Sequence, residues 1–440
     1  MLKKCQQEEK LSWWQLSFIG IGCIIGTGFF LGSSIAIEKA GPAVLLVYFT
    51  AGAGTYIVFR SLANLTAHHP EKGSFRTYAS QAFGSWAGFS NGWVYWSSEM
   101  LIMGSQLTAL SIFAQFWFPG LPLWSFAAIF ACLGLFVIKL GVRQVEKMEN
   151  MFGLIKVSAI LMFIILACLA LFGVIGPGEA SRQGETPLQP FFSEGGLGIW
   201  AALLYAFYAF GGIEVMGLMA NELKEPKEAP KSGTLMLILL TLFYVCAFYF
   251  VLKLTEWRNI STDESPFLTA LKNDSLPWFP HVFNGILIIA GFSTMVASLY
   301  AVTTMLMTLS EEGDAPRIFA QKKEGKVSKP AFALTVIVVI LSILLAVVLP
   351  ENIFEYITTA AGLMLLYNWI FILFSYRRLM GRSTREVVVV YVGILLIGLA
   401  VSGTLLDNMT RIGFFVSLCF IFVIAVAAFF KQRKTPASGA

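Results

Sequence analysis

Charged residues are scarce in this chain, and long polar stretches are absent. Charged residues make up 13% of the 440 residues, about half the usual share in a soluble protein, whereas apolar residues make up 57%. The longest polar segments, at about 175–195 and 255–279, are too short to build a hydrophobic core. A soluble domain is therefore excluded, and the composition predicts a helical protein that crosses a membrane many times.

The sequence also lacks the motifs of enzymes, metal sites and disulfide-bonded proteins. It contains no GxSxG, HExxH, Walker A or GxGxxG element in a suitable context. None of the six cysteines forms a CxxC pair or lies in a loop, and His68, His69 and His281 have no metal-ligand spacing. No catalytic site, cofactor, metal site or disulfide is expected. A cleavable signal peptide is not expected either, because the charged head continues into an apolar segment that is too long.

Twelve long apolar stretches are present instead. Charged residues or Pro/Gly clusters bound each stretch, and most reach the ~20 residues needed to cross ~30 Å of hydrocarbon. The predicted spans are 16–37, 42–59, 86–118, 121–138, 150–174, 196–221, 232–254, 280–310, 331–349, 353–376, 387–406 and 412–430. The predicted fold class is an all-α membrane protein with twelve transmembrane helices.

Lysine and arginine are distributed unevenly between the two sides of the predicted bundle. If the amino terminus is inside and the spans alternate, the inner segments hold 24 of the 31 Lys and Arg residues and the outer segments hold six. This asymmetry follows the positive-inside rule and predicts cytoplasmic amino and carboxyl termini in the cell membrane. The basic clusters are short, dispersed and close to the lipid bilayer, so nucleic-acid binding is not expected.

Glycines interrupt the first span at its centre. Five glycines lie within 20–32, and each weakens a helix by roughly 0.8–1 kcal/mol relative to alanine. A second break is predicted at 210–212 in the sixth span. Broken backbone at mid-membrane depth is tolerated where it lines a polar cavity, and paired breaks in two halves of a chain indicate a transporter binding site. The alternative is that the glycines only allow close helix packing, as Gly22-x-x-x-Gly26 does.

The positions of the breaks indicate an internal repeat. Each half would begin with a broken span, and the third span of each half is unusually long. Because five spans per half is an odd number, the halves would have inverted topology, as in inverted-repeat transporters. The sequence predicts a single transmembrane domain over 1–430, with repeats at about 12–174 and 196–377, extra helices at 387–430 and a short cytoplasmic tail at 431–440.

The predicted breaks offer backbone groups of opposite polarity. Amide groups at Gly26, Thr27 and Gly28 would lie at the positive end of a half-helix, which attracts a carboxylate. Carbonyl groups of residues 23–25, and those of the second break, would point the other way and accept from an ammonium group. A zwitterion needs this pair of poles.

Three ionisable side chains are predicted inside spans, where each needs a partner or a wet cavity. Lys156 is expected to bridge span 1 to span 8 as a fixed positive charge, unless it snorkels to the inner face. Glu214 follows the second break and is either a proton carrier or gate residue, or a structural partner of a backbone amide. Glu99 and Gln106 lie on one face of span 3, about 10 Å apart.

Aromatic residues near the second break are candidates for the lining of a side-chain pocket. Phe207, a helical turn before the break, is the first of them, and Tyr208, Phe210 and Trp369 follow. Aromatic side chains in membrane helices also serve as packing or interface anchors, and this is the alternative for each of the four.

Several of these segments resemble the amino acid–polyamine–organocation superfamily, in particular its bacterial permeases for aromatic amino acids, lysine and GABA. Segment 22–32 (GCIIGTGFFLG) is similar to the first-helix signature, and 209–214 (AFGGIE) to the sixth helix. Further similarity lies at 146–149, 154–157, 221–226, 229–231, 300, 313–317 and 368–369, so the resemblance covers nearly the whole chain in the right order.

The resemblance implies a five-plus-five inverted repeat and uptake of a free amino acid, usually coupled to protons. It implies that residues 26–28 bind the α-carboxylate of the amino acid. Backbone groups around Ile24, Phe207 and Phe210 would bind its α-amino group, with Gly211 beside them in the second break.

The resemblance also assigns charged residues. Lys156 falls on a fifth-helix lysine of the relatives, and Glu214 and Glu222 fall on two sixth-helix acids of lysine-permease-like members. The third-helix motif Ala-Glu-Leu-Thr-Ala instead reads Ser105-Gln-Leu-Thr-Ala109, so neutral Gln106 replaces an acid used in coupling or specificity. Glu99, two turns earlier on the same face, is a candidate replacement.

The sequence as a whole predicts a permease that imports a free amino acid by alternating access with proton symport. Ser105 and Gln106 offer only neutral hydrogen bonding, which favours a neutral apolar or aromatic substrate. An exchanger or efflux carrier of the same fold is the first alternative, because the missing third-helix acid weakens obligate proton coupling. A non-transporting amino acid sensor is a second alternative, which would be expected to carry a long cytoplasmic extension.

Overall fold

The computed structural model describes residues 11–71, 73–140, 142–175, 188, 190–219, 223–272, 276–320, 327–348, 353–381 and 383–434. Within these residues the chain is helical, and an isolated bridge joins Leu11 to Leu223. The helices are α1 (Trp13–Ile24), α2 (Thr27–Phe30), α3 (Gly32–Ala40), α4 (Val44–His68), α5 (Ser74–Phe83), α6 (Ser85–Gln115), α7 (Leu123–Leu140), α8 (Val142–Leu171), α9 (Gly195–Tyr208), α10 (Ile213–Met219), α11 (Ala229–Leu254), α12 (Pro266–Ala270), α13 (Phe279–Glu311), α14 (Lys329–Val348), α15 (Ile353–Leu379), α16 (Thr384–Gly403) and α17 (Asn408–Lys434).

Nine helical segments in the described ranges are long and apolar enough to cross a membrane. One of them, Thr27–His68, joins the second half of the first predicted span to the second span. The second span, predicted at only 42–59, continues to His68 as α4. An all-α architecture with many membrane spans is therefore confirmed, and the total of twelve spans stays a prediction. Helix α5, in the loop predicted between the second and third spans, was not predicted.

Local sequence signals account for several helix boundaries. Gly41 ends α3 with a φ of +57°, and Gly84 separates α5 from α6 with a φ of +96°. Glycine adopts such angles at little cost, whereas other residues do not. Ser12 and Gln15 form a capping box at the start of α1. Helices α11 and α13 carry proline in their first turn, where the missing N–H removes no hydrogen bond.

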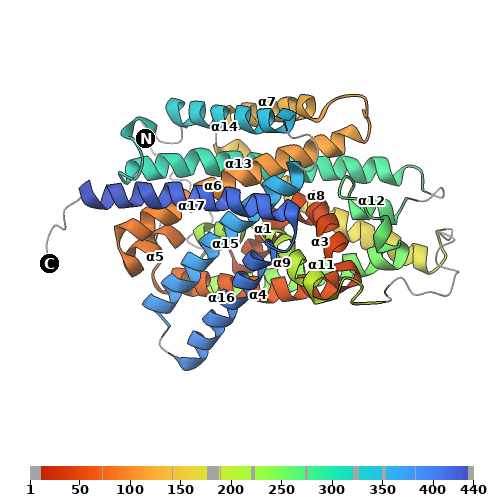
Figure 1. Ribbon diagram of the computed structural model, residues 1–440, viewed down its shortest axis with the longest axis horizontal. Helices are drawn as coiled ribbons and strands as arrows, with labels where there is room; N and C mark the ends of the chain where they lie inside the picture. Colours follow the sequence, from red (N-terminus) through yellow and green to blue (C-terminus); the bar gives the residue numbers. More distant parts are fainter. Residues whose placement is uncertain are drawn as a thin grey trace, which may run out of the picture.

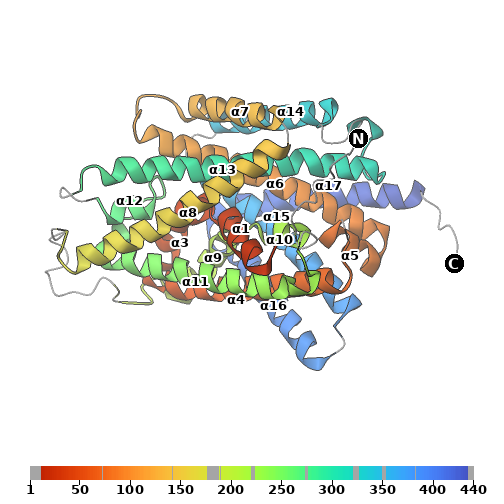
Figure 2. The same cartoon turned by 180° about the vertical axis from the view of Figure 1, so that it is seen from behind.

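The bundle has interior and peripheral helices. Helix α6 packs along both α13 and α15, and α4 packs along α11. Helices α7 and α14 lie side by side on one edge, and α16 lies on the opposite edge (Figures 1 and 2). In the apolar 18-residue stretch of α15, 78% is buried inside the bundle. In the corresponding stretch of α17, 22% is buried. Helix α15 is thus an interior helix, and α17 belongs to the periphery.

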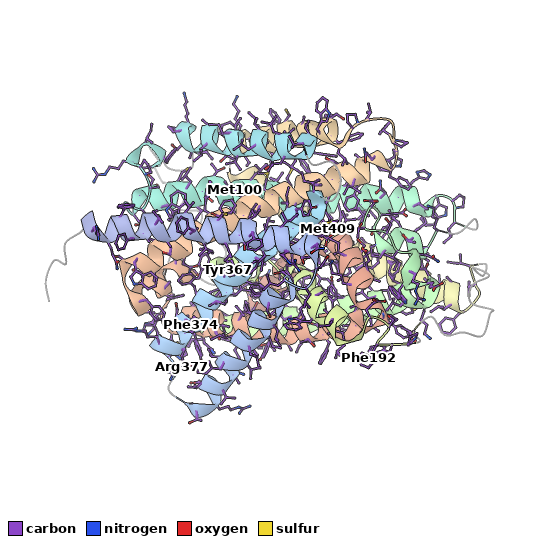
Figure 3. All side chains as sticks on the ribbon, in the orientation of Figure 1. Met100, Phe192, Tyr367, Phe374, Arg377 and Met409 are labelled. Atoms are coloured by element: carbon purple, nitrogen blue, oxygen red, sulfur yellow. The ribbon has the colours of Figure 1, made fainter. Side chains whose placement is uncertain are left out.

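Apolar side chains cover much of the outer surface of the bundle. Phe192, Phe374 and Met409, labelled in Figure 3, are exposed. Exposed apolar residues also recur along α7, α14, α16 and α17. A protein in water would bury this area, because apolar surface is unfavourable there. The outer surface is therefore suited to lipid.

Different elements occupy the two ends of the long axis (Figure 1). We call one the α5 end, because it holds α5 and the last turns of α17. The opposite one is the α12 end, which holds α12. Helices α1, α9 and α10 lie between the two ends, in the middle of the bundle (Figure 2).

Candidate site at two broken helices

The first predicted break lies between α1 and α2. Helix α1 ends at Ile24, the next two residues have extended backbone, and α2 begins at Thr27. The Gly26 carbonyl accepts from the amides of Phe29 and Phe30, both at 3.1 Å. The first amides of the restarting helix, at Thr27 and the following glycine, have no preceding turn to donate to. The whole break is buried in the bundle.

The second predicted break separates α9 from α10. Helix α9 ends at Tyr208, residues 209–212 form turns, and α10 begins at Ile213. Gly212 has a φ of +110°, in the region that favours glycine. The break is therefore confined to residues 209–212, which include the predicted 210–212.

Two of the carbonyl groups expected to face an ammonium group already have donors. The Phe207 carbonyl accepts from the Phe210 amide at 3.0 Å. The Ala209 carbonyl accepts from the Tyr244 hydroxyl of α11 at 3.1 Å. Each carbonyl oxygen has a second lone pair and can accept from a further donor.

The two breaks are in van der Waals contact with each other. A Cβ atom added to Gly28 would lie 3.0 and 3.1 Å from two carbons of the Tyr208 ring and 3.4 Å from the Ala209 Cα. A Cβ atom added to Gly212 would lie 3.4 Å from Cγ1 of Ile24. Glycine at both positions thus permits segments that are distant in sequence to meet at the centre of the bundle.

Helices α6 and α13 flank the first break. The Thr27 hydroxyl donates to Oε1 of Gln106 at 2.5 Å, so Gln106 faces the break. A Cβ atom added to Gly26 would lie 2.9 Å from Cγ2 of Thr294 on α13. Thr294 was not predicted, and the signal for it in the sequence is weak: Gly291, Ser293 and Thr294 are small or hydroxyl residues within a long apolar span. Ser105 faces α15 instead, where its hydroxyl lies 2.7 Å from that of Thr358.

Lys156 is buried and attached to the broken helix. Its side chain is fully inaccessible, and Nζ donates to the Gly22 carbonyl at 3.1 Å. One turn earlier, Gly153 packs so closely that a Cβ atom on Gly22 would lie 2.7 Å from the Gly153 Cα. The lysine is therefore not a snorkelling residue. Helix α8 also packs against α13, but the predicted bridge from Lys156 to that helix stays a prediction.

Glu214 connects the second break to α15. One carboxylate oxygen accepts from the Gly212 amide at 3.0 Å, and the other accepts from the Trp369 indole N–H. The Trp369 ring also meets the Phe207 ring edge-on. Glu214 is thus a partner of a backbone amide, one of its two predicted roles, and its side chain is buried.

The predicted aromatic lining separates into two groups. Phe207 packs under Gly54 of α4 and against Trp369, and Phe210 packs against Tyr244. These two side chains belong to the interhelical packing, whereas the Tyr208 ring lies against the first break.

Polar groups beside the second break lack partners in the described part of the chain. Both amide atoms of Asn368 are buried without a hydrogen bond, and the buried Tyr208 hydroxyl has Ser105 as its neighbour. Glu99 is buried too, and it lies within electrostatic range of the Tyr95 and Tyr208 hydroxyls. Unpaired buried polar groups are costly unless a ligand or water completes them. Glu222 lies outside the described residues.

Ion pairs lie at both ends of the bundle. At the α5 end, Arg76 contacts Glu312 and Asp314, and Lys431 of α17 also contacts Asp314. At the α12 end, Lys39 pairs with Glu355 and Asp407. In the described part of the chain, histidine, cysteine and acidic side chains form no group of three that could hold a metal ion.

Comparison with known proteins gives a consistent result. A model of the amino acid permease family matches residues 15–405. The Bacillus subtilis (strain 168) protein called "Uncharacterized transporter YcgH" is 54% identical over 432 residues, 98% of this chain and 97% of its own. The "Aromatic amino acid transport protein AroP" of Escherichia coli O6:H1 is 30% identical, over 80% of this chain and 78% of its own.

Another relative is the Bacillus subtilis "Uncharacterized amino acid permease YvbW", which is 29% identical over 84% of this chain and 83% of its own. Amino acid permeases are transporters and not enzymes. Together with the apolar helices, the match identifies a multi-pass membrane protein. The chain belongs to the amino acid permease family.

Proposed function

We propose that this protein imports a free amino acid across the cell membrane by alternating access, coupled to protons. The observation that carries the proposal is the contact between the two breaks, with Gly28 against Tyr208 and Gly212 against Ile24. Two interrupted helices that meet at the centre of a transporter leave backbone groups without helical partners. A substrate bound to these groups would lie midway between the two sides of the membrane.

The backbone groups would bind the two ends of the amino acid. The amides of Thr27 and Gly28 would donate to the carboxylate, and the carbonyl groups of residues 23–25 and Phe210 would accept from the ammonium group. The amino-terminal end of a helix favours an anion by its dipole and its free N–H groups. Gly211 and Ile24 would be in contact with the substrate backbone.

The substrate would be neutral, and apolar or aromatic. Gln106, the side chain that meets the first break, is uncharged, and it is already bound to Thr27. A substrate cation without a carboxylate partner would be costly in a dry cavity. Relatives named for aromatic amino acid transport support the same substrate class. Tyr208, whose ring lies against Gly28, is the aromatic residue that would contact the substrate side chain.

Proton coupling would involve the buried acids near the second break. Glu214 accepts from the Gly212 amide and the Trp369 indole on different oxygens, so protonation of one oxygen would weaken one of these two bonds. Glu99 would take the place of the acid that Gln106 replaces. The neutral Gln106 also favours the main alternative, an exchanger or efflux carrier of the same fold, because neither needs a proton in every cycle.

Alternating access would open one end of the bundle at a time. The positive-inside rule would place the α5 end, and both termini, in the cytoplasm. The Arg76 cluster would then close the inner side and the Lys39 cluster the outer side. Lys156, bound to the helix before the first break, would hold that helix through the cycle in place of a cation.

Transport by the purified protein in proteoliposomes tests the proposal. Uptake of each of the twenty amino acids is measured with and without an inward proton gradient. We expect saturable uptake of neutral apolar or aromatic amino acids, stimulated by the gradient. Uptake that depends on an amino acid preloaded inside the vesicles and not on the gradient would support the exchanger.

Competition tests the substrate class separately. We expect unlabelled leucine or phenylalanine to inhibit uptake of labelled phenylalanine, and lysine to leave it unchanged. Inhibition by lysine, with none by leucine, isoleucine, valine or phenylalanine, would overturn the neutral substrate and indicate that Glu99 or Glu214 faces the ligand.

A further inference from the structure

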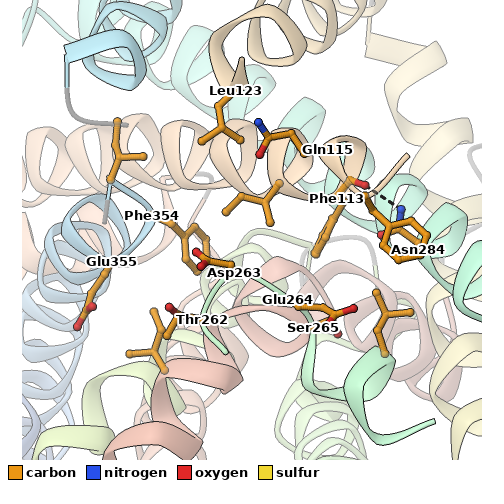
Figure 4. A pocket seen from close by; sticks show the side chains of 15 residues that line it. Phe113, Gln115, Leu123, Thr262, Asp263, Glu264, Ser265, Asn284, Phe354 and Glu355 are labelled. Atoms are coloured by element: carbon orange, nitrogen blue, oxygen red, sulfur yellow. Dashed lines mark hydrogen bonds between the residues drawn. The ribbon is translucent and has the colours of Figure 1, made fainter. Parts of the chain in front are cut away.

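A pocket lies at the α12 end, away from the two breaks (Figure 1). It has a volume of about 420 Å³ and is formed by α3, α6, α13, α15, α12 and the segment before α12. Figure 4 shows residues 262–265 facing side chains of α6 and α15 across this space. The volume falls in the usual range for small-molecule sites.

One part of the pocket wall is apolar. Ile112 and Phe113 of α6 and Phe116 just after it line this part, together with Leu268 of α12 and Phe354 of α15. A wall of this kind favours an organic group over a strongly hydrated inorganic ion, because contact with apolar surface cannot replace the water around such an ion.

The polar part of the wall is acidic. Asp263, Glu264 and Glu355 line the pocket, and none of the lining residues is lysine or arginine. Glu355 is already compensated, because Lys39 lies 3.0 Å from its carboxylate. The charges of Asp263 and Glu264 therefore set the net negative character of the pocket.

Lys39 also pairs with an acid outside the pocket wall. It lies 2.5 Å from Asp407, as well as contacting Glu355. Burial raises the pKa of Asp407, but the hydrogen bond and the charge of Lys39 outweigh this and leave that pKa below the usual aspartate value. Asp407 therefore stays ionised and keeps Lys39 paired.

Two buried polar atoms in the wall have no partner in the described residues. They are Oγ of Ser265 and Oδ1 of Asn284, both in fully buried residues that line the pocket. The Asn284 amide nitrogen donates to the Phe113 carbonyl at 2.8 Å, which fixes the orientation of the side chain. Oδ1 is thus an oriented acceptor that needs a donor.

We propose that this pocket is a second binding site, which takes a small organic ammonium cation with an apolar group. The ammonium would donate toward Asp263, Glu264 and the unpaired acceptors, and the apolar group would lie against the α6 wall. A free amino acid fits less well, because its carboxylate would face two carboxylates of the protein. The ligand class therefore differs from that of the broken helices, and the inference does not depend on transport.

Calorimetric titration of the purified full-length protein in detergent tests the site. The probe is 2-phenylethylamine, which carries an ammonium and an aromatic ring but lacks the carboxylate needed at the breaks. We expect it to bind, and the uncharged analogue 2-phenylethanol to bind much more weakly. Affinity for the amine should fall severalfold as NaCl rises from 0.05 to 0.5 M, because salt screens partly exposed charges.

Variants locate the binding. The double variant Asp263→Asn, Glu264→Gln should lose affinity for the amine by about five- to tenfold, the size expected for two partly exposed charge contacts. The matched control is Glu256→Gln, in the same loop. Glu256 is an exposed acid that pairs with Arg258, and it does not line the pocket. The control should bind like the wild type.

Three results would overturn the proposal. They are equal affinity for the amine and the alcohol, an affinity that does not change with salt, and wild-type affinity in the double variant. Loss of amine binding in Gly28→Leu but not in the double variant would place the amine at the broken helices instead. Failure to transport any amino acid would contradict the proposed function and leave this result intact.

Discussion

The two breaks lie side by side and are held in different ways. At the first break, the side-chain bonds are outside the interrupted residues: Lys156 binds Gly22 before it and Gln106 binds the Thr27 hydroxyl after it. At the second, they are inside: Tyr244 binds the Ala209 carbonyl and Glu214 binds the Gly212 amide. In the described part of the chain, side chains bind two backbone groups of the second break, whereas the Gly26 carbonyl of the first break is bonded only to the amides of Phe29 and Phe30.

This difference suggests a division of roles. Backbone groups that no side chain occupies are suited to a ligand that enters and leaves, because no internal bond has to break. Groups that are fixed by α11 and α15 are suited to transmit movement between the helices. We therefore expect substitutions at the first break to affect binding first, and those at the second to affect stability and turnover first.

Gly28→Leu should have the largest effect. A leucine side chain would overlap the Tyr208 ring and cover the amides of the first break, so binding of the transported amino acid should be abolished. Equilibrium binding of labelled substrate to purified protein measures this. Gly398→Leu is the control, because the space around Gly398 on α16 is open. Unchanged affinity in Gly28→Leu would show that the assignment of the site is wrong.

Lys156→Ala should stop turnover more than binding. The substitution leaves the buried Gly22 carbonyl without its donor, which costs ~1–3 kcal/mol and shifts the balance between inward and outward states. We expect transport to fall by more than about tenfold and substrate affinity to change little. Lys253→Ala, at the end of α11, is the control. Full transport by Lys156→Ala with an unaltered pH profile would contradict the role given to this lysine.

Glu214→Gln should weaken the second break. A glutamine has one acceptor oxygen, so it cannot accept from both the Gly212 amide and the Trp369 indole, and one buried donor loses its partner. We expect a loss of ~1–3 kcal/mol in stability, measured as a lower thermal unfolding temperature in detergent, together with slower transport. A variant with wild-type stability and wild-type transport would remove Glu214 from the account.

Tyr244→Phe should have the smallest effect. It removes one hydroxyl that donates to the Ala209 carbonyl, which is worth about 1 kcal/mol. Tyr48 provides a matched control, because it is buried beside Tyr244 and its hydroxyl has no partner in the described residues. Tyr48→Phe should leave the unfolding temperature unchanged or slightly raised. Equal losses in both variants would mean that the Ala209 bond contributes nothing.

The sequence predicted the parts of the structure that depend on local composition. Long apolar segments indicated the helices, and glycines indicated both breaks within a few residues, because helix propensity and hydropathy are local properties. It did not predict α5, which lies in a polar loop. The Tyr244 and Trp369 bonds to the second break were not predicted either, because they join residues whose proximity arises only when α9, α11 and α15 pack together.

Candidate binding residues show the same limit. Thr27 and Gln106 were each predicted for the site, but their mutual hydrogen bond was not. Phe207 was ranked above Tyr208 from its distance to the break, yet the Tyr208 ring is the one that lies against Gly28. Helical position alone does not say which neighbour a side chain meets.

A cryo-electron microscopy map of the purified protein with bound phenylalanine would test the central claim most directly. The account predicts density for the amino acid between the breaks, with its carboxylate within hydrogen-bonding distance of the Thr27 and Gly28 amides. Its ammonium group should face the carbonyl groups of residues 23–25 and Phe210. Density for the amino acid only in the pocket at the α12 end, or elsewhere away from both breaks, would contradict it.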